Sequence, residues 1–232
     1  MITDNLKRLR ERISRKCSEF NRNPDEITLI AVSKFFGIDV IRQANELGIT
    51  DFGENKPQEL RDKYELLGDK VVWHFIGNLQ KNKVKYVVKS AAYIHSLDSV
   101  ELADEVSKHA GKLNKIQKVL IEVKTSFEES KSGIETDKLF ELAEHCSKAV
   151  NLKLIGLMTM APYTDDEKII RKSFSDLRNL RDKLNNQGMS LTELSMGMTS
   201  DFEIAIEEGA TMLRIGSAIF GERDYSKNWR QL

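Results

Sequence analysis

The chain has 232 residues, of which 40% are hydrophobic and 31% are charged, enough apolar material for a sizeable core. Basic and acidic side chains balance at 36 each, so the zero net charge gives no electrostatic case for a nucleic-acid or membrane partner. The sequence contains no signal-peptide core, no apolar run of membrane-spanning length and no C-x-x-C pair. We therefore expect a cytoplasmic protein with free thiols at Cys17 and Cys146.

The predicted elements begin with an amphipathic helix at 3–20, because Ile2, Leu6, Leu9 and Ile13 recur at spacings of three and four. Beyond Pro24, short β-branched runs alternate with longer helical segments. The predicted strands are 27–33, 49–53, 71–75, 92–96, 116–123, 152–158, 190–194 and 210–214. The predicted helices between them are 38–47, 56–67, 79–88, 99–111, 135–149, 165–187 and 200–208.

Eight alternating strand–helix units favour a parallel sheet. Eight is also the number that closes a (β/α)8 TIM barrel, to which the first helix would be an extra element. An open doubly wound sheet is the alternative. No linker-like, repeated or low-complexity stretch interrupts the pattern, so we expect residues 1–232 to form a single domain.

Two glycine-containing segments follow the last two predicted strands, "SMGMTS" at 195–200 and "RIGSAIFG" at 214–221. Backbone N–H groups in such loops, together with hydroxyls, bind anions, and many barrels hold a phosphate at these two positions. Either loop alone could be an ordinary tight turn. Together they predict a phosphate site formed by Ser195, Gly197, Met198, Gly216 and Ser217.

The stretch "ITLIAVSKFF" at 27–36 reads as a buried strand that delivers Lys34 to its tip. A lysine at the barrel mouth, facing a phosphate site, suggests a Schiff base with pyridoxal 5′-phosphate. The alternative is a lysine that simply reaches solvent from a strand end.

Arg214 lies at the end of the last predicted strand. It could face the pyridine nitrogen of such a cofactor, and its permanently charged guanidinium would leave that nitrogen unprotonated and the ring a weak electron sink. The alternative is an arginine paired with a strand-end carboxylate.

The segments "AVSK", "FGEN", "WHFIGNLQKNK", "IHSLDS", "GLMTMAP", "LSMGM" and "SDFEIAIEEGATMLRIGSAIFG" occur in an order and spacing that resembles the pyridoxal phosphate homeostasis protein family, over residues 25–225. The resemblance implies a barrel similar to the N-terminal domain of alanine racemase. It makes Lys34 the residue modified by pyridoxal phosphate and places Arg214 at the pyridine nitrogen. It implies that the ring is lined by Asn55, Ile76 and Met158, and that the phosphate is held by Ser195, Gly197, Met198, Gly216 and Ser217. His74 either supports this site from behind or satisfies a core hydrogen bond.

Two segments depart from the family pattern. Phe35, Phe36 and Gly37 replace the usual threonine, lysine and proline after "SK", and Lys56 and Pro57 follow "GEN". Neither change removes a proposed ligand. They bear on the shape of the loop and on any role of a second lysine in cofactor transfer.

The resemblance implies a non-catalytic carrier that buffers the cofactor and delivers it, and we expect transient contacts with apo-enzymes. Without the second domain of the racemases, we expect a monomer. The alternative is an amino-acid racemase or lyase that uses Lys34. Racemisation needs proton-transfer groups on both faces of the substrate, and we expect no room after "FGER" for the second domain that supplies one in alanine racemases.

Other charged and polar residues receive simpler interpretations. Lys81, Lys85 and Lys89 form a basic helical stripe that we expect to be solvated. His95, His109 and His145 have no metal-ligand spacing, so we predict no metal site and structural or surface roles for them.

Overall fold

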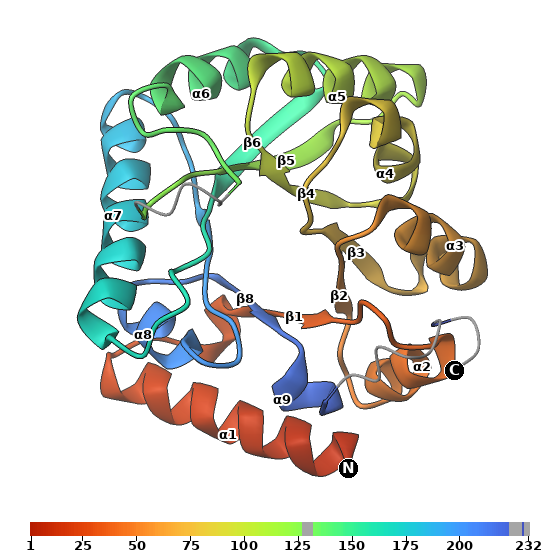
Figure 1. The fold of residues 1–232 in the computed structure, drawn as a ribbon, viewed down its shortest axis with the longest axis vertical. Helices are drawn as coiled ribbons and strands as arrows, with labels where there is room; N and C mark the ends of the chain where they lie inside the picture. The colour runs from red at the N-terminus through yellow and green to blue at the C-terminus, as the bar shows by residue number, and fades with distance from the viewer. Residues whose placement is uncertain (127–131, 223–228, 230–232) are drawn as a thin grey trace.

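The computed structural model describes residues 1–126, 132–222 and 229. Among these residues, eight parallel strands form a closed barrel in which each strand pairs with the next and the last pairs with the first (Figure 1). The strands are β1 (Thr28–Val32), β2 (Asp51–Glu54), β3 (Val72–Phe75), β4 (Tyr93–Leu97), β5 (Gln117–Glu122), β6 (Leu152–Met158), β7 (Glu193–Ser195) and β8 (Met212–Ile215). The predicted barrel is confirmed, and the open sheet is excluded.

The helices surround the barrel (Figure 1). They are α1 (Ile2–Glu19), α2 (Ile38–Glu46), α3 (Pro57–Leu67), α4 (Val84–Ser90), α5 (Val100–Lys112), α6 (Leu139–Lys148), α7 (Glu167–Asn186), α8 (Phe202–Glu207) and α9 (Ser217–Phe220). Short 3-10 helices are η1 (Pro24–Glu26), η2 (Gly68–Lys70) and η3 (Lys81–Lys83).

Some boundaries differ from the prediction. The strand expected at 190–194 is observed as β7 at Glu193–Ser195. It begins later because the Asn185 side chain hydrogen-bonds to both the N–H and the C=O of Leu191, which holds that residue against the end of α7. The helix expected at 79–88 is split into η3 and α4. The short helix α9 was not predicted.

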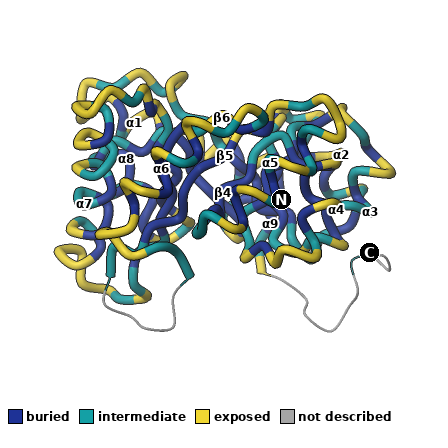
Figure 2. The backbone as a smooth tube through the Cα atoms, turned by 90° about the horizontal axis from the view of Figure 1, so that it is seen from above, coloured by how far each residue is buried: buried dark blue, intermediate teal, exposed yellow. Residues whose placement is uncertain are grey.

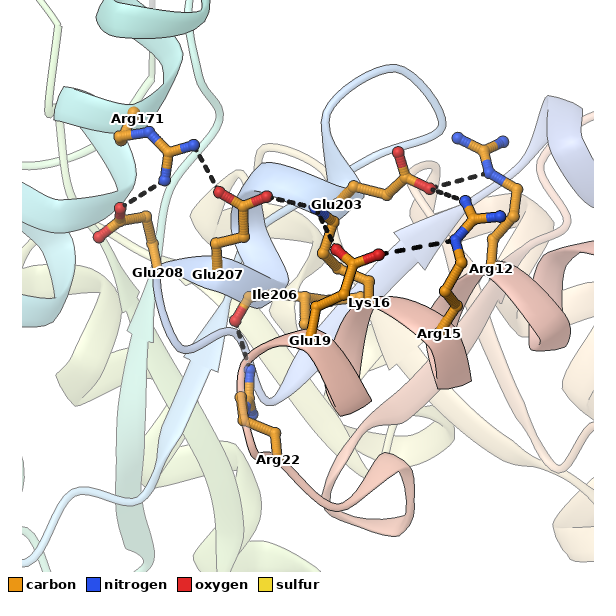
Figure 3. A network of polar contacts seen from close by, with 10 residues as sticks. All are labelled: Arg12, Arg15, Lys16, Glu19, Arg22, Arg171, Glu203, Ile206, Glu207 and Glu208. Atoms are coloured by element: carbon orange, nitrogen blue, oxygen red, sulfur yellow. Dashed lines mark hydrogen bonds and ion pairs between the residues drawn. The ribbon is translucent and has the colours of Figure 1, made fainter.

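The extra helix α1 lies along the outside of the barrel beside α8 and α9 (Figure 1). Its apolar stripe is buried, and its polar face joins an ion-pair network with α7 and α8 (Figure 3). In this network Lys16 lies 2.6 Å from Glu207, which also binds Arg171, while Arg12 binds Glu203 at 3.0 Å. The network fastens α1 to the helix that follows β7.

Apolar residues fill both sides of the sheet. Most of the core lies between strands and helices, and a smaller cluster inside the barrel contains Ile30, Leu120, Ile155, Met158 and Met212. Figure 2 shows the buried strands enclosed by helices whose outer faces are exposed. Both cysteines are buried free thiols, as predicted. None of the helices in the described part of the chain is long and apolar enough to cross a membrane.

Candidate cofactor site

The carboxyl ends of the parallel strands bring the predicted site residues to one edge of the barrel. Lys34, Asn55, Ile76 and Gly216 follow β1, β2, β3 and β8, and two more close their strands, Met158 in β6 and Ser195 in β7. Gly197 and Met198 continue the loop after β7, and Arg214 lies within β8. The sequence-derived grouping around one edge is therefore present in the fold.

The turn that carries Lys34 rests on a fully buried ion cluster. The Lys63 ammonium donates to Glu54 Oε1 at 2.7 Å, to Glu59 Oε1 at 2.8 Å and to the Ser33 carbonyl at 2.9 Å. The Ser33 hydroxyl donates to Glu54 at 2.6 Å. We call Ser33, Glu54, Glu59 and Lys63 the Lys63 cluster. Burial raises the pKa of Glu54 to about 7, although the adjacent Lys63 opposes that shift.

The two phenylalanines after Lys34 shape the same turn. Phe35 adopts a left-handed backbone (φ 72°), which is uncommon for a residue other than glycine, and its N–H donates to Glu59 Oε1 at 2.7 Å. The Phe35 ring lies under the Lys56 ammonium at 4.6 Å, and Phe36 packs on Phe220 with ring centroids 4.8 Å apart. Two of the residues that depart from the family pattern, Phe35 and Lys56, thus contact each other, and the Lys63 cluster holds the backbone of the turn at Ser33 and Phe35.

Asn55 and Ile76 lie on adjacent loops that approach closely. A Cβ on Gly77 would lie 2.2 Å from the Asn55 carbonyl oxygen, so only glycine fits there, and the Ile76 side chain packs over Gly53. The Asn55 side-chain oxygen is buried and has no hydrogen-bond partner among the described residues. A buried unpaired amide oxygen at this edge suits a ligand that brings a donor or a polar ring substituent.

Inside the barrel, Arg214 ends a row of hydrogen bonds that crosses the interior. Its Nη1 donates to Ser195 Oγ at 2.6 Å, and Ser195 Oγ lies 2.9 Å from His95 Nδ1. His95 Nε2 lies 2.9 Å from His74 Nδ1, and His74 Nε2 lies 2.9 Å from Asp51 Oδ1. We call these five residues the interior network.

Arg214 is buried, and its Nη2 donates to the Thr159 carbonyl at 2.8 Å. The carboxylates of Glu122 and Asp201 favour its charged form electrostatically. Burial lowers the Arg214 pKa to about 10, so the guanidinium stays charged at neutral pH. Burial also raises the pKa of Glu122 to about 7. A charged guanidinium whose hydrogen-bond partners are neutral suits an electron-rich acceptor such as a pyridine nitrogen.

The two predicted phosphate loops contact each other. Ser217 Oγ lies 3.2 Å from Thr199 Oγ1, and the Ala218 N–H donates to the same Thr199 oxygen. Gly197 has a left-handed backbone (φ 94°), and a Cβ there would lie 2.6 Å from Ala205 Cβ. Met198 and Ser217 are exposed, so an anion can reach this pair of loops from solvent.

The sequence predicts Ser195 at the phosphate site, whereas in the structure its hydroxyl faces the barrel interior. It is buried and bonded to His95 and Arg214, so its partners are in the barrel interior. For His95 we predicted a structural or a surface role, and the structure buries it fully in the same network. His74 makes a core hydrogen bond to His95, and a role in support of the cofactor site stays a prediction.

Sequence reasoning did not find Asp51, Glu59, Lys63 or Thr199. The one local signal was the four-residue spacing of Glu59 and Lys63, which places both on one face of α3. His109 and His145 pair with carboxylates of Glu105 and Asp104 away from the barrel interior.

The barrel is of the alanine-racemase-like class, and the family model of the alanine racemase N-terminal domain matches residues 2–224. A pyridoxal phosphate homeostasis protein from Aquifex aeolicus (strain VF5) is 46% identical over 96% of this chain and 98% of its own length. One from Haemophilus influenzae is 40% identical over 97% of each. The structure of PipY from Synechococcus elongatus PCC7942 with PLP bound is 33% identical, with a TM-score of 0.84, and covers 95% of this chain and 100% of PipY. The chain belongs to the pyridoxal phosphate homeostasis protein family.

Proposed function

We propose that this protein binds pyridoxal 5′-phosphate on Lys34 and serves as a non-catalytic carrier that buffers and delivers the cofactor in the cytoplasm. The observation that carries the proposal is the placement of Lys34 at the same barrel edge as the paired loops after β7 and β8. Membership of the homeostasis family and the PLP-bound structure of PipY support it.

Bound pyridoxal phosphate supplies an aldehyde. The Lys34 amine would bind that aldehyde covalently and reversibly. Gly197, Met198, Gly216 and Ser217 would hold the phosphate. Asn55, Ile76 and Met158 would line the ring, and Arg214 would meet its nitrogen, with Ser195 orienting the guanidinium.

Arg214 favours carrier over catalyst. An always-charged guanidinium at the ring nitrogen would donate a hydrogen bond without giving up its proton, so the ring would gain little power to stabilise a carbanion. The alternative function, racemase or lyase chemistry through Lys34, would need efficient proton transfer at the substrate despite this weak electron sink.

Titration with pyridoxal phosphate, followed by absorbance, tests binding. We expect a Schiff-base band in the wild type that is absent from Lys34→Ala. Assays of L-to-D exchange of alanine and serine test the alternative, and turnover that disappears in Lys34→Ala would overturn the carrier proposal. Faster loading of a cofactor-free enzyme by the loaded protein than by an equal amount of free cofactor would support direct delivery.

A further inference from the structure

The interior network has a single consistent direction of hydrogen bonding. At one end, the Arg214 guanidinium can only donate, so Ser195 Oγ accepts from it. The Ser195 hydroxyl is buried, and its other contact is with His95 Nδ1, so it donates its own proton to that nitrogen. This leaves the His95 proton on Nε2.

The other end leads independently to the same assignment. The Asp51 side chain is partly exposed, and a carboxyl group is ionised at neutral pH, so Asp51 only accepts and His74 carries its proton on Nε2. A neutral His74 then has a bare Nδ1, which must accept from His95 Nε2. Both ends therefore give the hydrogen bond between the histidines the same direction, from His95 Nε2 to His74 Nδ1.

The network also spans the barrel along its axis. Asp51 is the first residue of β2 and is partly exposed, whereas Ser195 is the last residue of β7 and Arg214 the third of β8. Because all strands run the same way, the row leads from the amino-terminal end of the barrel toward the edge that carries Lys34.

The rings have little freedom to reorient. His74 stacks on Tyr93, with centroids 4.4 Å apart and planes 3° from parallel, and the Lys118 ammonium donates to the Tyr93 hydroxyl. Both histidines are fully buried, and desolvation lowers their pKa values, so both rings are neutral.

We infer that Asp51, His74 and His95 are positioning residues, which act through Ser195 to fix the guanidinium of Arg214 toward the cofactor, with both imidazoles neutral and protonated on Nε2. The inference rests on the proposed function, because it concerns the same cofactor. It adds that a carboxylate at the far end of the barrel sets the strength with which the cofactor is held.

The first test needs neither cofactor nor substitution. Nitrogen NMR of the imidazoles in the free protein at neutral pH distinguishes bare from protonated ring nitrogens. We expect His74 and His95 each to show a protonated Nε2 and a bare Nδ1. A proton on Nδ1 of either ring, or a charged ring, would overturn the directional network.

The second test compares two matched substitutions. Asp51→Asn removes the charge at the end of the network, while Asp104→Asn changes a similar carboxylate that contacts His145 at 2.7 Å on the surface. We expect Asp51→Asn to weaken pyridoxal phosphate binding about tenfold, a coupling typical of one hydrogen-bonded network, and to shift the absorbance maximum of the bound cofactor. Asp104→Asn should change neither.

Wild-type affinity and an unshifted spectrum in a folded Asp51→Asn protein would refute the positioning role. If the wild type itself takes up no pyridoxal phosphate, the proposed function fails, and the imidazole tautomers then decide the network alone.

Discussion

The Lys63 ammonium lies 2.7 Å from Glu54 Oε1, and neither side chain is exposed to solvent. This contact joins α3 to the end of β2, and through the Ser33 carbonyl it reaches the residue that precedes Lys34. A buried charge is costly unless it is paired, so the Lys63 ammonium stays beside Glu54. Because the same ammonium also binds the Ser33 carbonyl, it holds the backbone next to Lys34 in place.

Replacing Lys63 by methionine should therefore strongly destabilise the fold. Lys63→Met leaves Glu54 and Glu59 facing each other without a cation, and we expect a loss of about 3–5 kcal/mol in the free energy of unfolding. Urea denaturation measures it. The matched control is Lys148→Met, which removes an exposed lysine with the same four-residue spacing to Glu144 and should cost less than about 1 kcal/mol. Equal losses in the two variants would show that the Lys63 cluster does not stabilise the turn.

Glu122 predicts a specific pH dependence of stability. Its pKa is raised to about 7 in the fold, so the folded state holds a proton that the unfolded chain releases above its ordinary value near 4.5. The resulting stability is complete below that ordinary value and is lost as pH rises through about 7, to a total of at most about 3 kcal/mol.

Glu122→Gln should remove this component. Denaturation curves at several pH values should show wild-type stability falling, relative to the variant, as pH rises from about 5 to 8. A constant difference between the two proteins across that range would contradict the raised pKa.

Gly197 offers a test of the phosphate loop. Gly197→Ala adds a Cβ 2.6 Å from Ala205 Cβ on a left-handed backbone, so it should reduce both stability and cofactor affinity, the former by about 2–3 kcal/mol. Gly188 is the control, because its backbone is equally left-handed (φ 95°) and an added Cβ meets nothing within 4 Å. Gly188→Ala should cost about 1 kcal/mol and leave affinity unchanged. Similar effects of both variants on affinity would argue against a phosphate at Gly197.

The network between α1 and α8 should be sensitive to salt. Glu207 joins Lys16 to Arg171, so Glu207→Gln should cost about 1 kcal/mol at low salt, and less in 1 M salt, where the Debye length falls to about 3 Å (Figure 3). Thermal unfolding of wild type and variant at both salt concentrations measures this. A loss that does not change with salt would point to packing rather than charge as the origin.

Much of the fold could be predicted because its signals are local. The alternation of strand and helix patterns predicted the barrel. Polar and glycine residues directly after the strands predicted a binding site at one edge of the barrel, with Lys34 and two glycine-containing loops. The helix at 38–47 and the strand at 27–33 illustrate this, since each closely matches the observed element.

The rest depended on partners that lie far apart in sequence. Ser195 and His95 are separated by 100 residues, and nothing local shows that the serine hydroxyl turns inward to meet the imidazole. Lys63 likewise reads as one more charged residue of an amphipathic helix until the fold places Glu54 and the Ser33 carbonyl beside it. Pattern predicts which face of an element is buried, whereas the partner across the core is a property of the tertiary structure.

Lys34 is the residue that we propose to hold the cofactor. Mass spectrometry of the protein after incubation with pyridoxal phosphate and reduction with borohydride tests this proposal most directly. We predict one reduced pyridoxal phosphate adduct per chain, located on Lys34 and lost in Lys34→Ala. An adduct on other lysines with Lys34 unmodified, or no adduct at all, would contradict the account.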